Sequence, residues 1–332
     1  MKKTRKEPRK NHTIPKFYLD RFAANQQIEV LALWENRRRY VSSTVKVATE
    51  RDFYMAVKED GTKTYDIEKA LSGIEGEAAK AMHRLAYGVL FPPSIADRYA
   101  LSTFLAYQFM RTPEQRRHLE AMSEYLQAVS LKLVTSDSQA QAYLRKRGVH
   151  TPTLDEVRAV LHRAELAETQ EYILAPNEYL RLMHTMAMQM APIIYAMRWV
   201  VGRFLRDVLV TSDHPITYYT IPGTRPSWVG TGLATADEVW FPLDPRHILM
   251  MEPPTGDPDE HLELDDSWAV AFNQNTVAHA WEYVFMTPGF DLTGFRLPRK
   301  PRPIVTVSEG WLEGKLPDGI NAPPIRRRHR RT

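Results

Sequence analysis

No cysteine occurs among the 332 residues of the chain. Disulfides, thiolate zinc sites, iron–sulfur clusters and cysteine nucleophiles are therefore excluded. The sequence also lacks a Walker loop, a dinucleotide-binding glycine fingerprint, a His-Glu-x-x-His motif and a Gly-x-Ser-x-Gly elbow. These absences argue against the commonest classes of ATPase, dehydrogenase, zinc protease and serine hydrolase.

Long hydrophobic runs are missing as well. The longest apolar stretch, residues 180–201, is interrupted by Arg181, His184, Gln189, Pro192 and Arg198. Such a segment is typical of a soluble helix rather than of a membrane span. After the basic N-terminus, residues 11–22 do not form the apolar run of a secretory signal. We therefore expect a cytoplasmic protein without membrane association.

Positive charge is concentrated at the two ends of the chain. Residues 1–10 contain six Lys or Arg and one Glu, and residues 321–332 contain five Arg and no acid. Each end therefore has a formal net charge of +5. Because the whole chain has a net charge of +4, the remaining residues together have a net charge of −6. Such tails either bind polyanions or keep the chain soluble. We expect a disordered basic tail at 1–10, one domain at 11–296, and an extended Pro/Arg-rich tail at 297–332.

The body of the chain has a globular composition, with 43% hydrophobic and 25% charged residues. Its periodicity predicts strands first, then a series of helices with a kink or break at Pro192, then mainly strands again. This arrangement favours an α+β fold with a helix-rich middle and a mixed or antiparallel β portion at the N-terminus and in the C-terminal half. The expected strands are 28–34, 39–47, 52–57, 208–210, 216–221, 239–243, 248–251 and 283–285, and the expected helices are 66–85, 94–111, 112–134, 153–168, 176–194 and 270–281.

Six short motifs follow one another between residues 11 and 290. The first is a His-x-x-Pro-x-Phe-Tyr-Leu-x-x-Phe run at 12–22, and the others are VKVATERDFY at 45–54, IEGEAA at 74–79, YQFMRTP at 107–113, TSDHP at 211–215 and FPLDP at 241–245. In this order they resemble the bacterial family called domain of unknown function 4238, which usually has Asn where this chain has His214. The resemblance implies a bacterial protein of uncharacterised activity and assigns no catalytic residue.

His12 is the first candidate for chemistry, because a neutral imidazole acts as a general base or as a metal ligand. The alternative is a histidine whose ring anchors the start of the domain through a local hydrogen bond. Glu75 and Glu77 lie on the first long helix, where side chains two positions apart point to different sides. Only one of them is therefore expected to serve a site, and the other to be solvated. Glu77 is the one that we select as a candidate.

Gln108 and Arg111 lie on or beside an apolar helix stripe, so their polar groups need partners. Arg111 directly precedes a helix start at Pro113, and a guanidinium beside free backbone N–H groups is a natural anion site for a phosphate or a carboxylate. The alternative is a structural arginine paired with an acidic residue such as Asp213.

Asp213 and His214 end a hydrophobic strand, where sites often occur. They are candidates for acid–base groups or metal ligands, and the alternative is a turn in which the Asp side chain bonds the backbone. Adjacent Ser, Asp and His residues do not form a hydrolase triad, because triad members come from separate segments.

Two functional hypotheses follow from these residues. In the first, the protein is a phosphodiesterase or nuclease that acts on nucleic acid, with bacterial defence as a candidate setting. His12, Glu77, Asp213 and His214 then hold a divalent ion such as Mg²⁺ or Mn²⁺ or move protons, while Gln108 and Arg111 hold a phosphate. In the second, the same residues are structural, and the tails bind nucleic acid or a protein partner without catalysis. Substrate and oligomeric state are not predicted.

Overall fold

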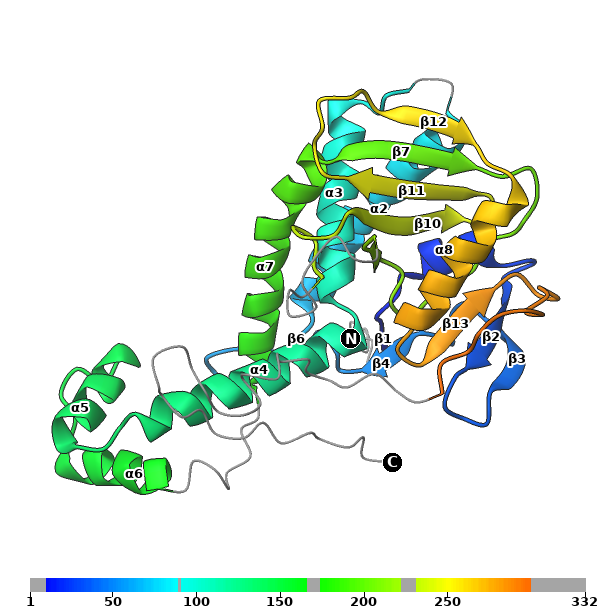
Figure 1. Ribbon diagram of the computed structural model, residues 1–332. Coiled ribbons are helices and arrows are strands. Elements are labelled where there is room, and N and C mark those ends of the chain that lie inside the picture. The colour runs from blue at the N-terminus through cyan, green and yellow to red at the C-terminus, as the bar shows by residue number, and fades with distance from the viewer. Residues whose placement is uncertain (1–9, 89–90, 166–173, 222–230, 300–332) are drawn as a thin grey trace, which may run out of the picture. The chain divides into compact units, whose positions relative to one another are not determined.

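The computed structural model describes residues 10–88, 91–165, 174–221 and 231–299 (Figure 1). The chain divides into two compact units, one formed by residues 1–116 and 176–302 and the other by residues 117–175 and 303–332. The two predicted tails lie almost entirely outside the described residues. The described part contains eight α-helices together with mixed and antiparallel sheets, which confirms the predicted α+β class.

The first unit begins with a short strand that pairs with a later one. β1 (Lys10–His12) runs antiparallel to β4 (Thr49–Arg51), and α1 (Lys16–Leu19) and the 3-10 turn η1 (Asp20–Phe22) follow β1 directly. β2 (Gln27–Ala32) and β3 (Arg38–Ser43) form a hairpin. The connection, residues 33–37, ends in a turn closed by a bond from the Arg38 N–H to the Glu35 carbonyl at 3.0 Å. The two central residues of this turn, Asn36 and Arg37, both have φ in the left-handed region, at 51° and 54°. β5 (Ala56–Val57) and β6 (Lys63–Thr64) form a second, smaller hairpin.

Three long helices lie side by side in this unit, with α3 (Ile95–Met110) in contact with both α2 (Asp66–Tyr87) and α7 (Pro176–Ala196) (Figure 1). Their ends follow the predicted signals. The Ser94 hydroxyl accepts a hydrogen bond from the Asp97 N–H and so caps α3, and Gly88 follows the last residue of α2. α4 (Pro113–Lys132) begins after Thr112, whose hydroxyl accepts from the Gln115 N–H. Of the two outcomes predicted at Pro192, a kink or a break, the break does not occur, because α7 continues through this residue.

Two sheets complete the first unit. The first has the strand order β12–β7–β11–β10–β9, in which only the β12–β7 pair is parallel. The second has the order β3–β2–β13–β8. Helix α8 (Asp266–His279) packs Phe272 against the first sheet and Val277 against the second, so it joins the two hydrophobic cores. The remaining strands are β7 (Arg198–Arg203), β8 (Thr211–Ser212), β9 (Thr217–Tyr219), β10 (Glu238–Asp244), β11 (His247–Glu252), β12 (Glu260–Glu263) and β13 (Tyr283–Met286).

Some elements differ from the prediction. β7 and β12 were not predicted, and residues 208–210 do not form the expected strand. In the second unit, α4 continues to Lys132 and is followed by the unpredicted α5 (Asp137–Lys146) and by α6 (Leu154–Glu165). These helices bury a small core of their own, made of Leu131, Val134, Ala140, Val157 and Val160. No helix in the described ranges is long and apolar enough to cross a membrane.

Candidate functional site

The segment that carries His12 is held against the helices by its neighbour Asn11, which is fully buried. The Asn11 side chain donates from Nδ2 to Glu68 Oε2 at 2.7 Å, and its Oδ1 accepts from the Tyr54 N–H at 3.4 Å. The Tyr54 hydroxyl donates to the backbone carbonyl of His12 at 3.1 Å. β1 is therefore tied both to α2 and to the chain after β4, which orients the His12 side chain.

Arg111 ends α3 and is 1% exposed. Its Nη1 donates to Glu75 Oε1 on α2 at 2.6 Å, and its Nε donates to Gln108 Oε1 at 2.8 Å. Gln108 in turn donates from Nε2 to the backbone carbonyl of Thr13 at 3.2 Å. The partner of Arg111 is thus Glu75 rather than Asp213, and the guanidinium lies too deep to touch a solvent-borne phosphate. Its role is to position the groups around it.

His12 is half-buried and lies within electrostatic range of both members of the Arg111–Glu75 pair. Burial lowers the pKa of the imidazole. The bond to Thr44 and the charge of Glu75 oppose this effect, while Lys16 and Arg111 add to it. Nε2 lies 3.3 Å from the carbonyl of Thr44, which only accepts hydrogen bonds. Nε2 therefore carries the proton, and Nδ1 has the free lone pair of a neutral imidazole.

A second carboxylate, Glu68, lies about two turns before Glu75 on α2 and interacts with it electrostatically. Burial raises the pKa of Glu68 and the charge of Glu75 raises it further, whereas the hydrogen bond from Asn11 lowers it. The half-buried Glu75 thus lies within electrostatic range of a neutral base, His12, and of a carboxyl group with a raised pKa, Glu68. Such a pair is suited to acid–base chemistry.

Glu77 lies outside this cluster. It is exposed and bonds Lys80 one turn along the same helix, with 2.8 Å between Lys80 Nζ and Glu77 Oε1. Glu75 and Glu77 thus point to different sides of α2, as their spacing predicts, but it is Glu75 that faces His12 and Arg111.

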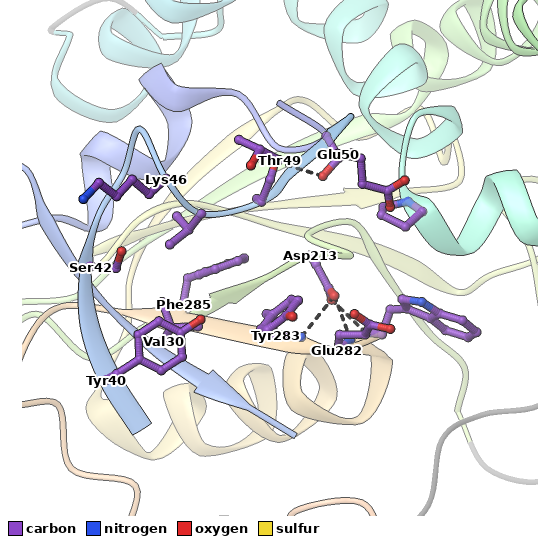
Figure 2. Close-up of a pocket in the computed structure, with 15 residues that line it drawn as sticks. Val30, Tyr40, Ser42, Lys46, Thr49, Glu50, Asp213, Glu282, Tyr283 and Phe285 are labelled. Atoms are coloured by element: carbon purple, nitrogen blue, oxygen red, sulfur yellow. Dashed lines mark hydrogen bonds between the residues drawn. The ribbon is translucent and has the colours of Figure 1, made fainter. Parts of the chain in front are cut away.

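Asp213 is buried and binds backbone. Its carboxylate accepts from the N–H groups of Trp281, Glu282 and Tyr283 at 2.8, 2.7 and 3.0 Å, which fixes the start of β13 (Figure 2). Burial raises the pKa of Asp213 to about 7 against the lowering effect of these three bonds. Asp213 also lines a pocket of about 330 Å³. His12 and Arg111 are not among the residues that line it.

His214 is enclosed with a different partner. Its Nδ1 lies 2.8 Å from Glu114 Oε2, and the side chains are 5% and 3% exposed. The ring also packs edge-on against Phe109. The four residues His12, Glu77, Asp213 and His214 are therefore not gathered into one site. In the described ranges, no three His, Asp or Glu side chains lie close enough to hold a metal ion such as Mg²⁺ or Mn²⁺.

Residues 10–289 match the family model described as protein of unknown function, DUF4238. The chain belongs to this family. Searches of curated proteins and of solved structures found no match. Three of the motifs that carried the resemblance to DUF4238 supply the acid–base cluster: 12–22 supplies His12, 74–79 supplies Glu75, and 107–113 supplies Gln108 and Arg111.

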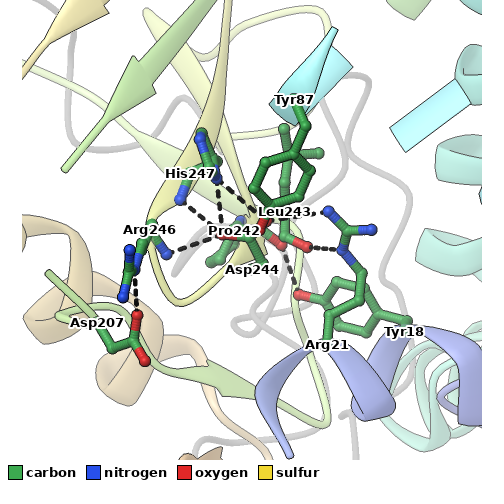
Figure 3. A network of polar contacts seen from close by, with 9 residues as sticks. All are labelled: Tyr18, Arg21, Tyr87, Asp207, Pro242, Leu243, Asp244, Arg246 and His247. Carbon is green, nitrogen blue, oxygen red and sulfur yellow. Dashed lines mark hydrogen bonds and ion pairs between the residues drawn. The ribbon is translucent and has the colours of Figure 1, made fainter. Parts of the chain in front are cut away.

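A further polar centre of this DUF4238 chain was not predicted as a site. Asp244, from the FPLDP motif, is 2% exposed and accepts from Arg21 Nη2 at 3.0 Å, from the Tyr87 hydroxyl at 2.8 Å and from the His247 ring Nδ1 at 2.9 Å (Figure 3). It also accepts from the N–H groups of Arg246 and His247. Hydrogen bonds from His247 lower its pKa against the effect of burial. Asp244 thereby joins η1, the end of α2 and the β10–β11 turn. The FPLDP motif is the sequence feature that could have identified this residue.

Proposed function

We propose that this DUF4238 protein is a phosphodiesterase that cleaves RNA by acid–base catalysis, with His12 as the proton acceptor. The observation that carries the proposal is that Glu75, which is held by the buried Arg111, lies within electrostatic range of both His12 and Glu68. A neutral imidazole can accept a proton, and a carboxyl group of raised pKa holds a proton to higher pH than an ordinary one and can donate it. RNA suits such a pair because its 2′-hydroxyl is a nucleophile built into the substrate.

In the proposed step, His12 Nδ1 takes the proton of the 2′-hydroxyl, and the 2′-oxygen attacks the adjacent phosphorus. The bond from phosphorus to the 5′-oxygen breaks, and that oxygen takes a proton from the carboxyl group of Glu68. The products are a 2′,3′-cyclic phosphate and a free 5′-hydroxyl. The imidazolium and the Glu68 carboxylate then return to their starting forms by exchanging protons with water.

The remaining residues support this step without touching the reacting atoms. Glu75 and Gln108 hold Arg111, and this set fixes α2 and α3 around β1. Lys16, 40% exposed at its side chain, adds positive potential near His12. The basic tails at 1–10 and 321–332 attract the polyanionic substrate, so binding is expected to weaken as salt is raised. We further propose that the protein acts in the cytoplasm of a bacterium.

The test is the incubation of the purified chain with an RNA oligonucleotide and with DNA of the same sequence, in EDTA and in Mg²⁺ or Mn²⁺. We expect RNA to be cut in EDTA to products with 2′,3′-cyclic phosphate ends, identified by mass spectrometry. DNA has no 2′-hydroxyl and should stay intact. Intact RNA under every condition, or equal cleavage of DNA, would contradict the proposal.

A second candidate is a binding module in which the same residues are structural. The observation in its favour is that Asn11 and Gln108 are fully buried and bond the backbone of Tyr54 and Thr13. In this case the tails bind nucleic acid without turnover. Salt-sensitive RNA binding by an intact protein that cuts neither RNA nor DNA would favour this candidate.

A further inference from the structure

The pocket beside Asp213 has the β3–β2–β13–β8 sheet on one side and residues 46–50 on the other (Figure 2). Tyr40 and Ser42 lie two positions apart on β3, so their side chains point to the same face of this sheet, and Tyr283 on β13 also lines the pocket. All three residues are partly exposed. At about 330 Å³, the pocket is at the small end of the range for ligand sites, so it suits a small chemical group.

One end of the pocket is lined by groups that can donate hydrogen bonds. Lys46 is exposed and lies with Ser42 and Tyr40 at the end away from Asp213 (Figure 2). Among the described residues, the hydroxyl groups of Tyr40, Ser42 and Tyr283 form no hydrogen bond. The Lys46 amine likewise forms no ion pair within the described ranges. An ammonium group and three hydroxyl groups are therefore available to a ligand in this pocket.

The other end of the pocket is acidic, with Asp213, Glu282 and Glu50 (Figure 2). Asp213 is occupied by three backbone N–H groups, and Glu50 and Glu282 interact with other residues of the protein. These carboxylates are not available to hold a ligand. Their negative charge nevertheless repels an anion from this end of the pocket, so an anion is directed to the end that carries Lys46.

We propose that this pocket binds a phosphate monoester, with the phosphate held by Lys46 and by the hydroxyl groups that line the pocket. Such a phosphate has a charge of about −1.5 to −2 at pH 7 and three strong acceptor oxygens. It can therefore use an ammonium group and hydroxyl groups from two strands together, whereas a planar carboxylate has two oxygens and one charge. The ester is either a small molecule or the 5′-phosphorylated end of a nucleic acid strand, because both present this group. The binding involves no chemical step, so it is independent of RNA cleavage.

The test is calorimetric titration of the full chain with phenyl phosphate and with benzoate, which has the same ring but a carboxylate. We expect phenyl phosphate to bind at least about tenfold more tightly. Lys46→Gln, Tyr40→Phe and Tyr283→Phe should each weaken phenyl phosphate about tenfold, the effect of losing one hydrogen bond to a charged group. Lys58→Gln and Tyr99→Phe are the matched controls, because both residues are exposed and lie outside the pocket. Thermal unfolding of each variant checks that it is folded.

Two short DNA oligonucleotides, one with a 5′-phosphate and one with a 5′-hydroxyl, distinguish the two sources of the ester. DNA is used because the proposed cleavage leaves it intact. Tighter binding of the phosphorylated strand that is lost in Lys46→Gln would identify a nucleic acid end as the ligand. Equal binding of the two strands, together with binding of phenyl phosphate, would identify a small ester. Absence of phenyl phosphate binding, equal binding of benzoate, or equal effects of Lys46→Gln and Lys58→Gln would overturn the proposal.

Discussion

Replacing His12 by glutamine is expected to lower the rate of RNA cleavage by about 10²- to 10⁴-fold, the usual contribution of a general base. Stability should change little, because the hydrogen bond of the ring to the Thr44 carbonyl at 3.3 Å can also be made by a glutamine amide. The rate is measured with a fluorescent RNA oligonucleotide, and folding is checked by circular dichroism and thermal unfolding.

His162→Gln is the control for this prediction, because His162 lies in α6 with its side chain 70% exposed. It should cleave RNA at the rate of the unchanged protein. A folded His12→Gln variant that retains full activity would remove His12 from the mechanism. A variant that fails to fold would show that His12 has the structural role of the second candidate function.

Replacing Arg111 by methionine is expected to lower the free energy of unfolding by about 3–5 kcal/mol, as happens when one partner of a buried ion pair is removed. Arg111 is 1% exposed and bonds Glu75 and Gln108, so its loss leaves both without their donor. The change is measured by urea unfolding followed through tryptophan fluorescence.

The matched control is Lys80→Met. Lys80 and Glu77 form an ion pair at the surface of α2, with 2.8 Å between Nζ and Oε1. An exposed pair of this kind contributes about 0.5 kcal/mol, so the variant should unfold almost like the unchanged protein. Equal losses of stability in the two variants would contradict the buried role of Arg111.

Local signals in the sequence predicted most of the helices. The Ser94 cap, Pro113 at the first position of α4 and the Thr153–Glu156 capping box are all present, with the Thr153 hydroxyl accepting from the Glu156 N–H. These features act within one turn of a helix, so neighbouring residues are enough to recognise them. α5 was not predicted because its apolar stripe is short: only Ala140 is fully buried, and Tyr143 and Leu144 pack partly buried beside it.

The errors arise where tertiary packing decides the structure. β7 follows α7 after a single residue and becomes a strand by pairing with β11 and β12, which are distant in sequence. α7 passes through Pro192 while it packs along α3, and those contacts maintain the helix despite the lost hydrogen bond.

The candidate site, too, was predictable only where local motifs mark its residues. The motifs at 12–22 and 107–113 identified His12, Gln108 and Arg111, which the fold brings together. Helical spacing showed that Glu75 and Glu77 diverge, but only the packing of α2 beside α3 determines which of them meets Arg111. Asp213 bonds residues that follow it by about 70 positions, and such a distant backbone partner leaves no local pattern.

The central claim is that folding places a neutral His12 beside Glu75 and Arg111, and an NMR titration of the His12 ring tests it most directly. The signal is assigned by comparison with His12→Gln. We expect a pKa below the ordinary 6.5, because the ring is buried, and a still lower pKa in Glu75→Gln, because the charge of Glu75 raises it. A His12 pKa at or above 6.5 that does not respond to Glu75→Gln would contradict the account.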